Sequence, residues 1–514
     1  MKLTFNTGLS ACTRAVVAFS LCALCACHAT TGAGVRPSAP ATSARAGAAA
    51  ADAAAGLRRD IDRILADPGL ERGYWAVDVR SLKTGETLYA QNARKLMMPA
   101  SNMKVVTLAA AAQQLGWDFT YETIVRAAGP IANGVLAGDL IVVGSGDPSL
   151  ASTDGSADRL FADCAAQLKK AGVRTIDGRI VGDDNTFDDE TLGFGWSWDD
   201  LPDDYAAGTG ALQLNENSVR ITITPAPTVG GTAGVAVVPT ASGLVVDNEV
   251  TTSAADTPAS VRTKRLPGSS RLALRGTVPV GAAPLVESVS VDNPTLFFVA
   301  ALRAALIANG VDVRGPAVDI DDVSDVRPTD THTILTYRSP PLSTLAARLM
   351  KASQNQYAET LLKTLAGPSG VRTAAAGRLA VTSVLEAWGV PAGDLIQRDG
   401  SGLSRYDYVT ADALVTILAH VYADERLRGP FEASLPIAGR DGTLGNRMKG
   451  TAAEGNVRAK TGSMSNVRTL SGYLTSADGE PFAFAILANN FEAPAETINN
   501  ATEAIVVRLA RFRR

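Results

Sequence analysis

The pattern of hydrophobic and polar residues changes several times along the chain and predicts its elements. Apolar residues at helical spacing predict a short helix over residues 57–65, and two alternating segments around a glycine turn at 83–85 predict a β-hairpin. Directly afterwards, the alanine-rich apolar run at 105–112 predicts a buried helix. The N-terminal part should therefore contain a helix, a hairpin and a second, buried helix.

The centre of the chain has a different pattern. Alternating strands with glycine turns are expected over 118–150, and residues 215–291 are rich in Thr, Val and Pro with little helical periodicity. Helical patterns return from residue 293, and the chain ends in strand patterns followed by a helix at about 498–509. A mainly β segment is therefore expected inside a mixed framework.

Together these segments predict an α/β (α+β) fold with a split domain. Residues 52–112 and 292–514 are expected to form one unit around an antiparallel sheet. Residues 113–291 are expected to form one or two inserted, mainly β domains, with the boundary between them left open. A length of 514 residues is sufficient for two or three domains with a large core.

Residues 1–27 resemble an export signal. Lys2 and Arg14 precede an apolar run that is too short to span a bilayer as an ordinary transmembrane helix. The run ends in Leu-Cys-Ala-Cys, which resembles a lipoprotein signal box with Cys27 as the lipidated residue; ordinary signal cleavage a few residues later is the alternative. Residues 28–51, rich in Ala, Thr, Gly, Ser and Pro, predict a flexible linker. We expect export to the periplasm or cell envelope, with a lipid anchor.

Composition narrows the classes of function. The chain is 46% hydrophobic and 19% charged with a formal net charge of −4, which is ordinary for a soluble globular enzyme and offers no basic block for nucleic acid. Cys164 is the one cysteine beyond the signal segment, so no disulfide framework is expected. No Cys/His cluster or H-E-x-x-H motif occurs, so we expect neither a metal nor a cofactor.

The stretch before the buried helix carries the first candidate chemistry. Ser101 and Lys104 are three residues apart, so on a helix they share a face and their Oγ and Nζ atoms can converge. A serine hydroxyl needs an adjacent base to act as a nucleophile, and a lysine that loses its proton on burial can supply one. For this motif taken alone, a capping serine with a solvent-facing lysine is the alternative.

Two further motifs complete an ordered set. An S-x-N motif at 353–355 lies in a helical segment, and a K-T-G-S motif at 460–463 ends an alternating strand. S-x-x-K and S-x-N each occur once in the sequence. K-T-G occurs twice, and the copy at 83–85 is assigned to the hairpin turn.

In this order the three motifs resemble those of the serine penicillin-recognising enzymes. The long insert after the first motif narrows the resemblance to the low-molecular-mass class C penicillin-binding proteins, which are D-alanyl-D-alanine carboxypeptidases and endopeptidases. The resemblance spans roughly residues 55–510. Further stretches similar to this group are 138–148, 195–198, 399–405 and 439–444.

The resemblance implies a role for each motif residue. Ser101 would attack the carbonyl between two D-alanines while Lys104 takes its proton. Ser353 would relay a proton to the departing amine, Asn355 would hold the peptide amide of the substrate, and Lys460 would keep this region positive. The implied partners are peptidoglycan stem peptides and β-lactam antibiotics, which would acylate the same serine and leave slowly.

The same resemblance implies a substrate-binding surface. The backbone N–H groups of Ser101 and Ser463 would form the oxyanion hole. The K-T-G-S strand would bind the terminal carboxylate, and three further residues would recognise the diamino acid of the stem peptide. These candidates are Thr461, Gly462 and Ser463 for the carboxylate, and Met464, Asp183 and Arg405 for the diamino acid. For the last three, ordinary surface or loop residues are the alternative.

Two other functions remain as alternatives. A β-lactamase would need a deacylating base, and neither an E-x-x-L-N nor a Y-x-N segment is present. A catalytically silent cell-wall-binding homologue would be expected to lack one of the motif residues, and all are intact. A Ser-His-Asp hydrolase is disfavoured because the sequence has no G-x-S-x-G elbow.

Overall fold

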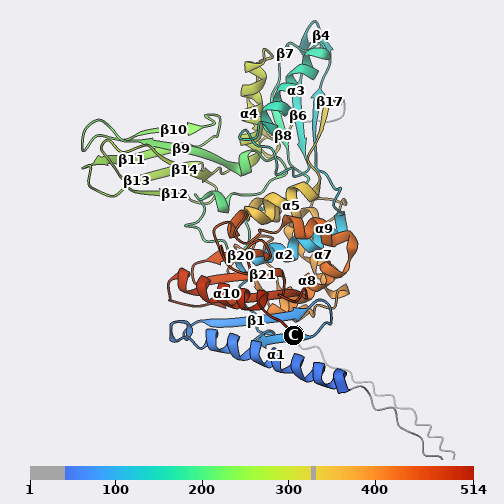
Figure 1. Cartoon of the computed structure of the whole chain (residues 1–514). Helices are drawn as coiled ribbons and strands as arrows, with labels where there is room; N and C mark the ends of the chain where they lie inside the picture. Colours follow the sequence, from blue (N-terminus) through green and yellow to red (C-terminus); the bar gives the residue numbers. More distant parts are fainter. Residues whose placement is uncertain (1–40, 326–330) are drawn as a thin grey trace, which may run out of the picture. The chain divides into compact units, whose positions relative to one another are not determined.

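The computed structural model describes residues 41–325 and 331–514, and the predicted export signal with Cys27 lies outside them. The fold described below is that of the compact unit Ala50–Arg514 (Figure 1). Helix α1 (Ala41–Leu65) begins inside the segment predicted as a flexible linker, since its many alanines favour helix. None of the described helices is both long and apolar enough to cross a membrane.

A five-stranded antiparallel sheet joins the two ends of the chain. Its strand order is β2-β1-β22-β21-β20, so the N-terminal hairpin lies beside the C-terminal strands. The strands are β1 (Tyr74–Ser81), β2 (Thr87–Gln91), β20 (Arg458–Met464), β21 (Val467–Thr475) and β22 (Pro481–Asn489). This arrangement confirms the predicted α/β fold with a split domain.

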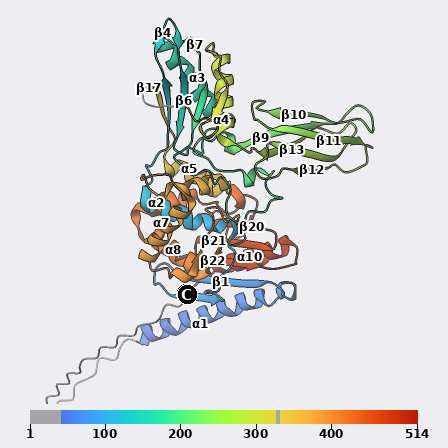
Figure 2. The same ribbon diagram turned by 180° about the vertical axis from the view of Figure 1, so that it is seen from behind.

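Helices cover both faces of this sheet (Figure 2). Along β22, Phe484 and Ile486 enter a core with α1 and α10, while Ala485 and Leu487 enter a core with α2 and α8. Alternate residues of a strand point to opposite faces, so both sides of this strand are buried. The helices and short strands of this unit are α2 (Met103–Leu115), α5 (Leu342–Lys351), α6 (Asn355–Thr364), α7 (Ala374–Ala387), β18 (Leu395–Ile396), β19 (Tyr408–Val409), α8 (Ala411–Ala423), α9 (Glu425–Ser434) and α10 (Ala495–Ala510).

The insert contains several smaller sheets. One has the order β16-β8-β6-β3-β17 and packs against α3 and α4, and two three-stranded sheets have the orders β10-β9-β14 and β11-β13-β12. Its elements are β3 (Glu122–Ala128), β4 (Ile131–Ala132), β5 (Val135–Leu136), β6 (Asp139–Gly144), α3 (Ser156–Lys170), β7 (Thr175–Ile176), β8 (Ile180–Asp183), β9 (Ser218–Thr224), β10 (Gly234–Val238), β11 (Val245–Ser253), β12 (Ser260–Lys264), β13 (Arg271–Pro279), β14 (Leu285–Ser290), α4 (Pro294–Ala308), β15 (Asp312–Val313), β16 (Ala317–Asp319) and β17 (Thr331–Arg338).

The chain returns to the split unit later than the predicted boundary at residue 292. Helix α4 packs on α3, β8 and β16, and its Phe297 and Leu302 lie in the core of the insert. Strand β17 pairs with β3, so residues 294–338 belong to the insert. The first helix after the return is α5, which begins at Leu342.

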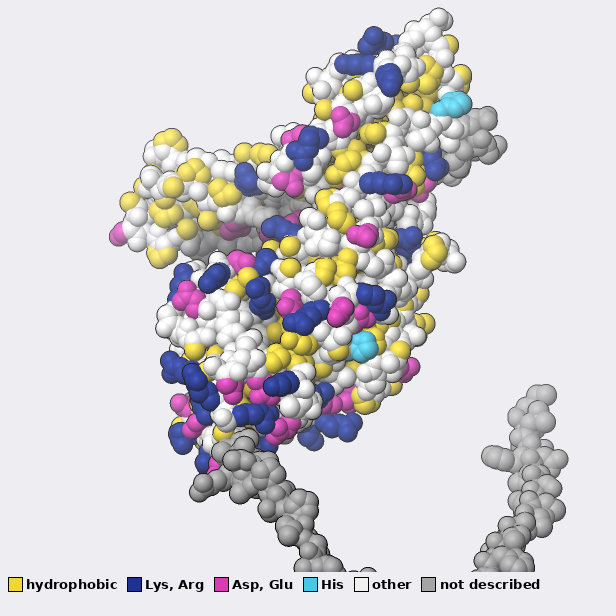
Figure 3. Space-filling view, turned by 45° about the vertical axis from the view of Figure 1, so that its right-hand side comes forward, with side chains coloured by type: hydrophobic (Ala, Val, Ile, Leu, Met, Phe, Trp, Pro, Cys, Tyr) yellow, Lys and Arg dark blue, Asp and Glu magenta, His cyan; other side chains and the backbone are white. Residues whose placement is uncertain are grey.

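The surface carries charges of both signs. On the face shown in Figure 3, Lys and Arg side chains are interspersed with Asp and Glu. Several form exposed pairs, such as Arg271 with Asp247 at 2.7 Å. Exposed pairs of this kind add little to stability, so the buried apolar cores hold the fold.

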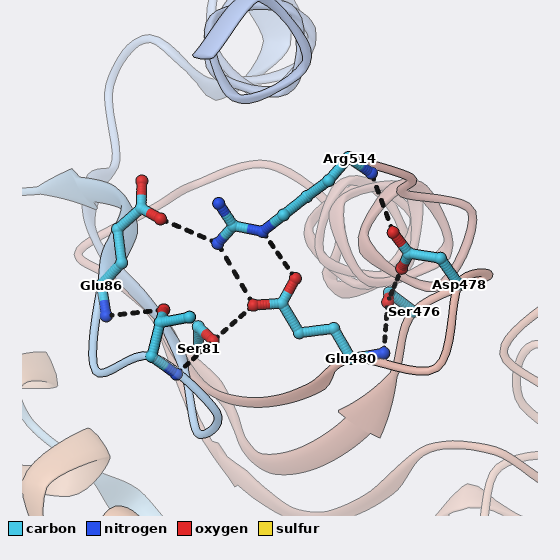
Figure 4. Close-up of polar contacts among 7 residues, drawn as sticks. Ser81, Glu86, Ser476, Asp478, Glu480 and Arg514 are labelled. Atoms are coloured by element: carbon cyan, nitrogen blue, oxygen red, sulfur yellow. Dashed lines mark hydrogen bonds and ion pairs between the residues drawn. The ribbon is translucent and has the colours of Figure 1, made fainter. Parts of the chain in front are cut away.

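One polar cluster ties the C-terminal residue to the N-terminal hairpin (Figure 4). The Arg514 guanidinium donates to Glu480 at 2.7 Å and to Glu86 at 2.8 Å, and its backbone N–H donates to Asp478 at 2.9 Å. Ser81 Oγ donates to the same Glu480 carboxylate at 2.5 Å. The Glu480 side chain is only 7% exposed, so its charge depends on these donors.

Replacing Arg514 with alanine is expected to destabilise this unit. A nearly buried carboxylate that loses its charged donor costs about 1–3 kcal/mol. We expect a lower midpoint of urea unfolding, followed by circular dichroism. Arg513→Ala is the matched control because Arg513 is an exposed neighbour of the same type. Equal midpoints for the two variants would contradict the assignment.

Candidate active site

Ser101 lies in the short 3₁₀ turn that leads into α2. The preceding Ala100 has a φ of 46°, a left-handed conformation that is strained for a residue with a Cβ. The turn is held from the other end of the chain, because Asn102 Nδ2 donates to Thr469 Oγ1 at 2.6 Å and to the Lys460 carbonyl at 3.2 Å. Contacts with β20 and β21 therefore fix the turn that carries Ser101.

Lys104 brings a fully buried amine to this serine. Its Nζ lies 2.8 Å from Ser101 Oγ and 2.6 Å from Asn355 Oδ1. A third neighbour is the Ser401 carbonyl oxygen, at 3.0 Å. Burial lowers the pKa of Lys104 to about 7, against the opposing effect of the Asp399 and Glu359 charges. Near neutral pH, a large fraction of this lysine can therefore accept a proton.

A second serine–lysine pair lies beside the first. Lys460 Nζ lies 2.8 Å from Ser353 Oγ and 2.8 Å from the Thr461 carbonyl oxygen. Lys460 is fully buried, and desolvation, with the nearby Lys104 charge, moves its pKa well below the usual value. Ser353 has a φ of 62°, so this serine too is held in a strained conformation.

Strand β20 runs close past the turn that carries Ser101 because the strand contains a glycine. A Cβ on Gly462 would overlap Thr469 Oγ1 and would lie 2.6 Å from the Pro99 carbonyl oxygen. Beyond this point, Ser463 and Met464 reach the cavity, while Thr461 Oγ1 shares a hydrogen bond with Thr443 Oγ1 at 2.7 Å. Gly462 therefore lets the edge strand approach the serine.

These groups surround one cavity of about 320 Å³. Of the residues predicted from sequence, Ser101, Ser353, Asn355, Arg405, Ser463 and Met464 line it. Lys104 and Lys460 lie behind their serines at hydrogen-bond distance. The structure thus brings the three motifs, which are far apart in sequence, to one place.

Asp183 is not brought to this cavity. It ends β8, and its carboxylate accepts a hydrogen bond from Asn185 Nδ2 at 3.1 Å. Sequence reasoning missed Asp200 and Tyr205, which line the cavity from the insert. The signal that pointed to this loop was the neighbouring stretch at 195–198. Tyr205 also touches the motif residues, since its carbonyl accepts from Asn355 Nδ2 at 2.8 Å.

Among the described residues, one group has carboxylates at metal-ligand spacing. Asp184, Asp319 and Asp321 have oxygen atoms within 4.8 Å of one another in the insert. Thr295 Oγ1 donates to Asp184 at 2.5 Å and Asn293 Nδ2 donates to Asp319 at 2.7 Å. Burial raises the pKa of Asp184 to about 6. Asp184 and Asp319 thus each accept a hydrogen bond from a neighbouring side chain, and we assign the group no metal.

A serine beside a buried lysine, and a second serine beside a lysine of an edge strand, are the arrangement of the penicillin-recognising serine hydrolases. The model of the D-Ala-D-Ala carboxypeptidase 3 (S13) family matches residues 57–512. The chain belongs to this family and is a serine-type D-alanyl-D-alanine carboxypeptidase, which confirms the resemblance drawn from the motifs.

Relatives and solved structures agree with this placement. The chain is 37% identical over 469 residues to a D-alanyl-D-alanine carboxypeptidase of Actinomadura sp. strain R39, covering 89% of this chain and 85% of that one. It is 29% identical to the D-alanyl-D-alanine carboxypeptidase DacB of Haemophilus influenzae, over 80% and 84% of the two chains. The crystal structure of penicillin binding protein 4 (dacB) from Haemophilus influenzae superimposes with a TM-score of 0.79 and 27% identity, covering 88% of this chain and 99% of that one.

Gly402→Ala is expected to displace the turn that carries Ser101. Gly402 has a φ of 84°, and a Cβ there would overlap the carbonyl oxygen of Ala100. Gly389 has a φ of 82° but nothing within 4 Å of its Cβ position, so Gly389→Ala is a control with the same backbone strain. We expect acylation by a fluorescent penicillin to slow about tenfold or more only in Gly402→Ala. Equal rates in the two variants would show that the collision is unimportant.

Proposed function

We propose that this protein removes the terminal D-alanine from peptidoglycan stem peptides through an acyl-enzyme on Ser101. The observation that carries the proposal is the distance of 2.8 Å between Ser101 Oγ and the fully buried Nζ of Lys104. A desolvated amine with a lowered pKa is a suitable general base for a serine hydroxyl.

Acylation follows from the positions of the side chains. Neutral Lys104 takes the proton of Ser101, and Oγ adds to the carbonyl carbon between the two D-alanines. The backbone N–H groups of Ser101 and Ser463 donate to the resulting oxyanion. Ser353 relays the proton that Lys104 took up to the leaving amine, which returns Lys104 to its neutral form. The C–N bond breaks, and free D-alanine departs. The lysine of the second pair, Lys460, orients the Ser353 hydroxyl at 2.8 Å.

Substrate binding uses the edge of the sheet and the cavity. Thr461, Gly462 and Ser463 on β20 would bind the terminal carboxylate, and Asn355 would hold a peptide amide. Arg405 and Met464 line the cavity and would contact the diamino acid of the stem peptide. Asp200 supplies the carboxylate for a free amine there, a role predicted for Asp183, which the cavity does not include.

Water then hydrolyses the acyl-enzyme and restores Ser101. A β-lactam offers a strained amide to the same serine, but its leaving group stays attached to the acyl chain, and hydrolysis of this adduct would be slow. One relative's crystal structure, penicillin binding protein 4 from Haemophilus influenzae, was solved in complex with a β-lactam. We also propose endopeptidase activity on cross-linked peptides, because the acyl group is identical and only the leaving amine differs.

Ser101→Ala is expected to abolish both the release of D-alanine and the acylation by penicillin. Wild-type protein should release D-alanine from a peptide ending in D-alanyl-D-alanine and should give a persistent penicilloyl adduct on the Ser101 peptide by mass spectrometry. The variant should do neither, because it lacks the nucleophile. Rapid turnover of penicillin to penicilloate by the wild type would instead indicate a β-lactamase, and absence of any adduct would indicate a silent binding protein.

An envelope location suits an enzyme that acts on the cell wall. We propose that the chain is exported and carries a lipid on Cys27, which lies outside the described residues. The supporting feature is the Leu-Cys-Ala-Cys end of the apolar run.

Cys27→Ala is expected to abolish metabolic labelling of the full-length chain by a palmitate analogue in a bacterial host. Cys25→Ala is the matched control, since it removes a cysteine two residues earlier and should keep the label. A wild-type chain without label would favour ordinary signal cleavage.

A further inference from the structure

Three buried carboxyl groups lie behind the catalytic lysine without lining the substrate cavity. They belong to Glu359, Asp399 and Asp407, and each is nearly or completely buried. Buried carboxyl groups are costly unless hydrogen-bonded, so their contacts indicate what they are for.

Glu359 contacts two backbone amides with its two oxygen atoms. It accepts from the Gly400 N–H at 2.8 Å and from the Ser401 N–H at 2.8 Å. It also lies four residues after Asn355 on α6, so the two side chains share one face of the helix. Asn355 Oδ1 contacts Lys104 Nζ directly. Glu359 instead binds the backbone N–H of Ser401, whose carbonyl oxygen contacts the same Nζ.

The Ser401 carbonyl has a specific consequence for a lysine that acts as a base. A neutral amine has two N–H groups and one lone pair. If Asn355 Oδ1 and the Ser401 carbonyl each accept one N–H, the lone pair is left facing Ser101 Oγ. Without the Ser401 carbonyl, the amine could rotate and point an N–H at the serine.

The adjoining loop is fixed by the other two carboxyl groups. Asp399 accepts from the Gly402 N–H at 2.7 Å, from the Ser404 N–H at 2.6 Å and from Trp196 Nε1 at 2.8 Å. Asp407 accepts from the Arg398 N–H at 2.5 Å. Of the three carboxyl groups, Glu359 thus binds the N–H groups of Gly400 and Ser401, while Asp399 binds the N–H of Gly402, which shares a peptide unit with the Ser401 carbonyl.

We propose that Glu359 is a positioning residue for acylation, which holds the Ser401 carbonyl against Lys104 Nζ so that the lone pair of the neutral amine faces Ser101. The inference rests on the proposed function of Lys104 as the base.

The charges around this group determine how pH should reveal the role. Asp399 and Glu359 favour the charged form of Lys104, while burial opposes it, and Lys460 lies nearby on the other side. Burial and the Asp399 charge raise the pKa of Glu359 to about 8, and burial with the Asp399 charge raises that of Asp407 well above its usual range. Loss of the carbonyl acceptor disfavours the ammonium form of Lys104, and at pH values where Glu359 is ionised the loss of its negative charge acts in the same direction.

The test is the pH profile of the second-order acylation rate of Glu359→Gln with a fluorescent penicillin. The glutamine oxygen can accept one N–H, but its NH₂ group faces the other, so the Ser401 carbonyl should shift. We expect the maximal rate to fall about tenfold or more. We also expect the acid limb, near pH 7 in the wild type, to move about half a pH unit or more toward lower pH.

Two controls make the result decisive. Glu480→Gln removes another buried carboxylate of the same unit, one that binds Ser81 and Arg514, and should leave the acid limb in place. Glu359→Asp keeps the charge but is too short for both amides, and should give a smaller shift in the same direction. It also serves as the second variant if Glu359→Gln does not fold.

The outcomes distinguish a failure of the positioning role of Glu359 from a failure of the proposed function. If the Glu359 variants fold and their acid limb is not shifted, the positioning role is overturned. This holds for any fraction of active protein, because the position of the acid limb does not depend on that fraction. A wild-type protein that penicillin does not acylate would instead refute the proposed function.

Discussion

The burial of one amine is the constraint on which the active site depends. Transfer of an ammonium group out of water costs several kcal/mol, and Lys104 responds by giving up its proton more easily. The three polar partners around its Nζ are a hydroxyl, an amide oxygen and a backbone carbonyl, all of them neutral. A carboxylate in any of these places would restore the high pKa of the lysine and remove the base. The site therefore needs polar partners without a direct counter-charge.

The split fold supplies those partners from separate parts of the chain. The N-terminal part contributes Ser101 in the turn before α2 and Lys104 on α2, and the C-terminal part contributes β20, whose approach Gly462 permits. Between them, α6 places Asn355 against the amine and the insert places the Tyr205 carbonyl against Asn355. The insert is thus in direct contact with the motif residues. A change in its packing would move Asn355 and thereby alter the hydrogen bond that Asn355 makes with Lys104.

Much of the fold and of the candidate site could be predicted from sequence. The features that could not be predicted depend on tertiary packing. The three motifs were identifiable because their chemistry resides in residue types at fixed local spacing, such as Ser101 and Lys104 on one turn of helix. The residue at which the chain leaves the insert could not be identified in this way. The apolar pattern of α4 is compatible with the core of the insert and with that of the split unit, and only tertiary packing assigns the helix to the insert. Nor could sequence distinguish Asp183 from Asp200, since the folding of a long loop decides which carboxylate reaches the cavity.

Glu359 belongs to a third kind of residue, whose sequence signal is visible only when its role is already suspected. An acidic residue four positions after Asn355, on a helix buried along its whole length, conflicts with a simple apolar packing role. Replacing buried polar groups by well-packed apolar ones is often neutral or stabilising, so stability alone does not explain the three carboxyl groups behind Lys104. What an apolar side chain could not do is hold the backbone N–H groups of Gly400 and Ser401, and with them the residue whose carbonyl contacts Lys104. The desolvation cost of Glu359 is therefore, on the proposed mechanism, the cost of orienting a lysine that must itself stay without a counter-ion.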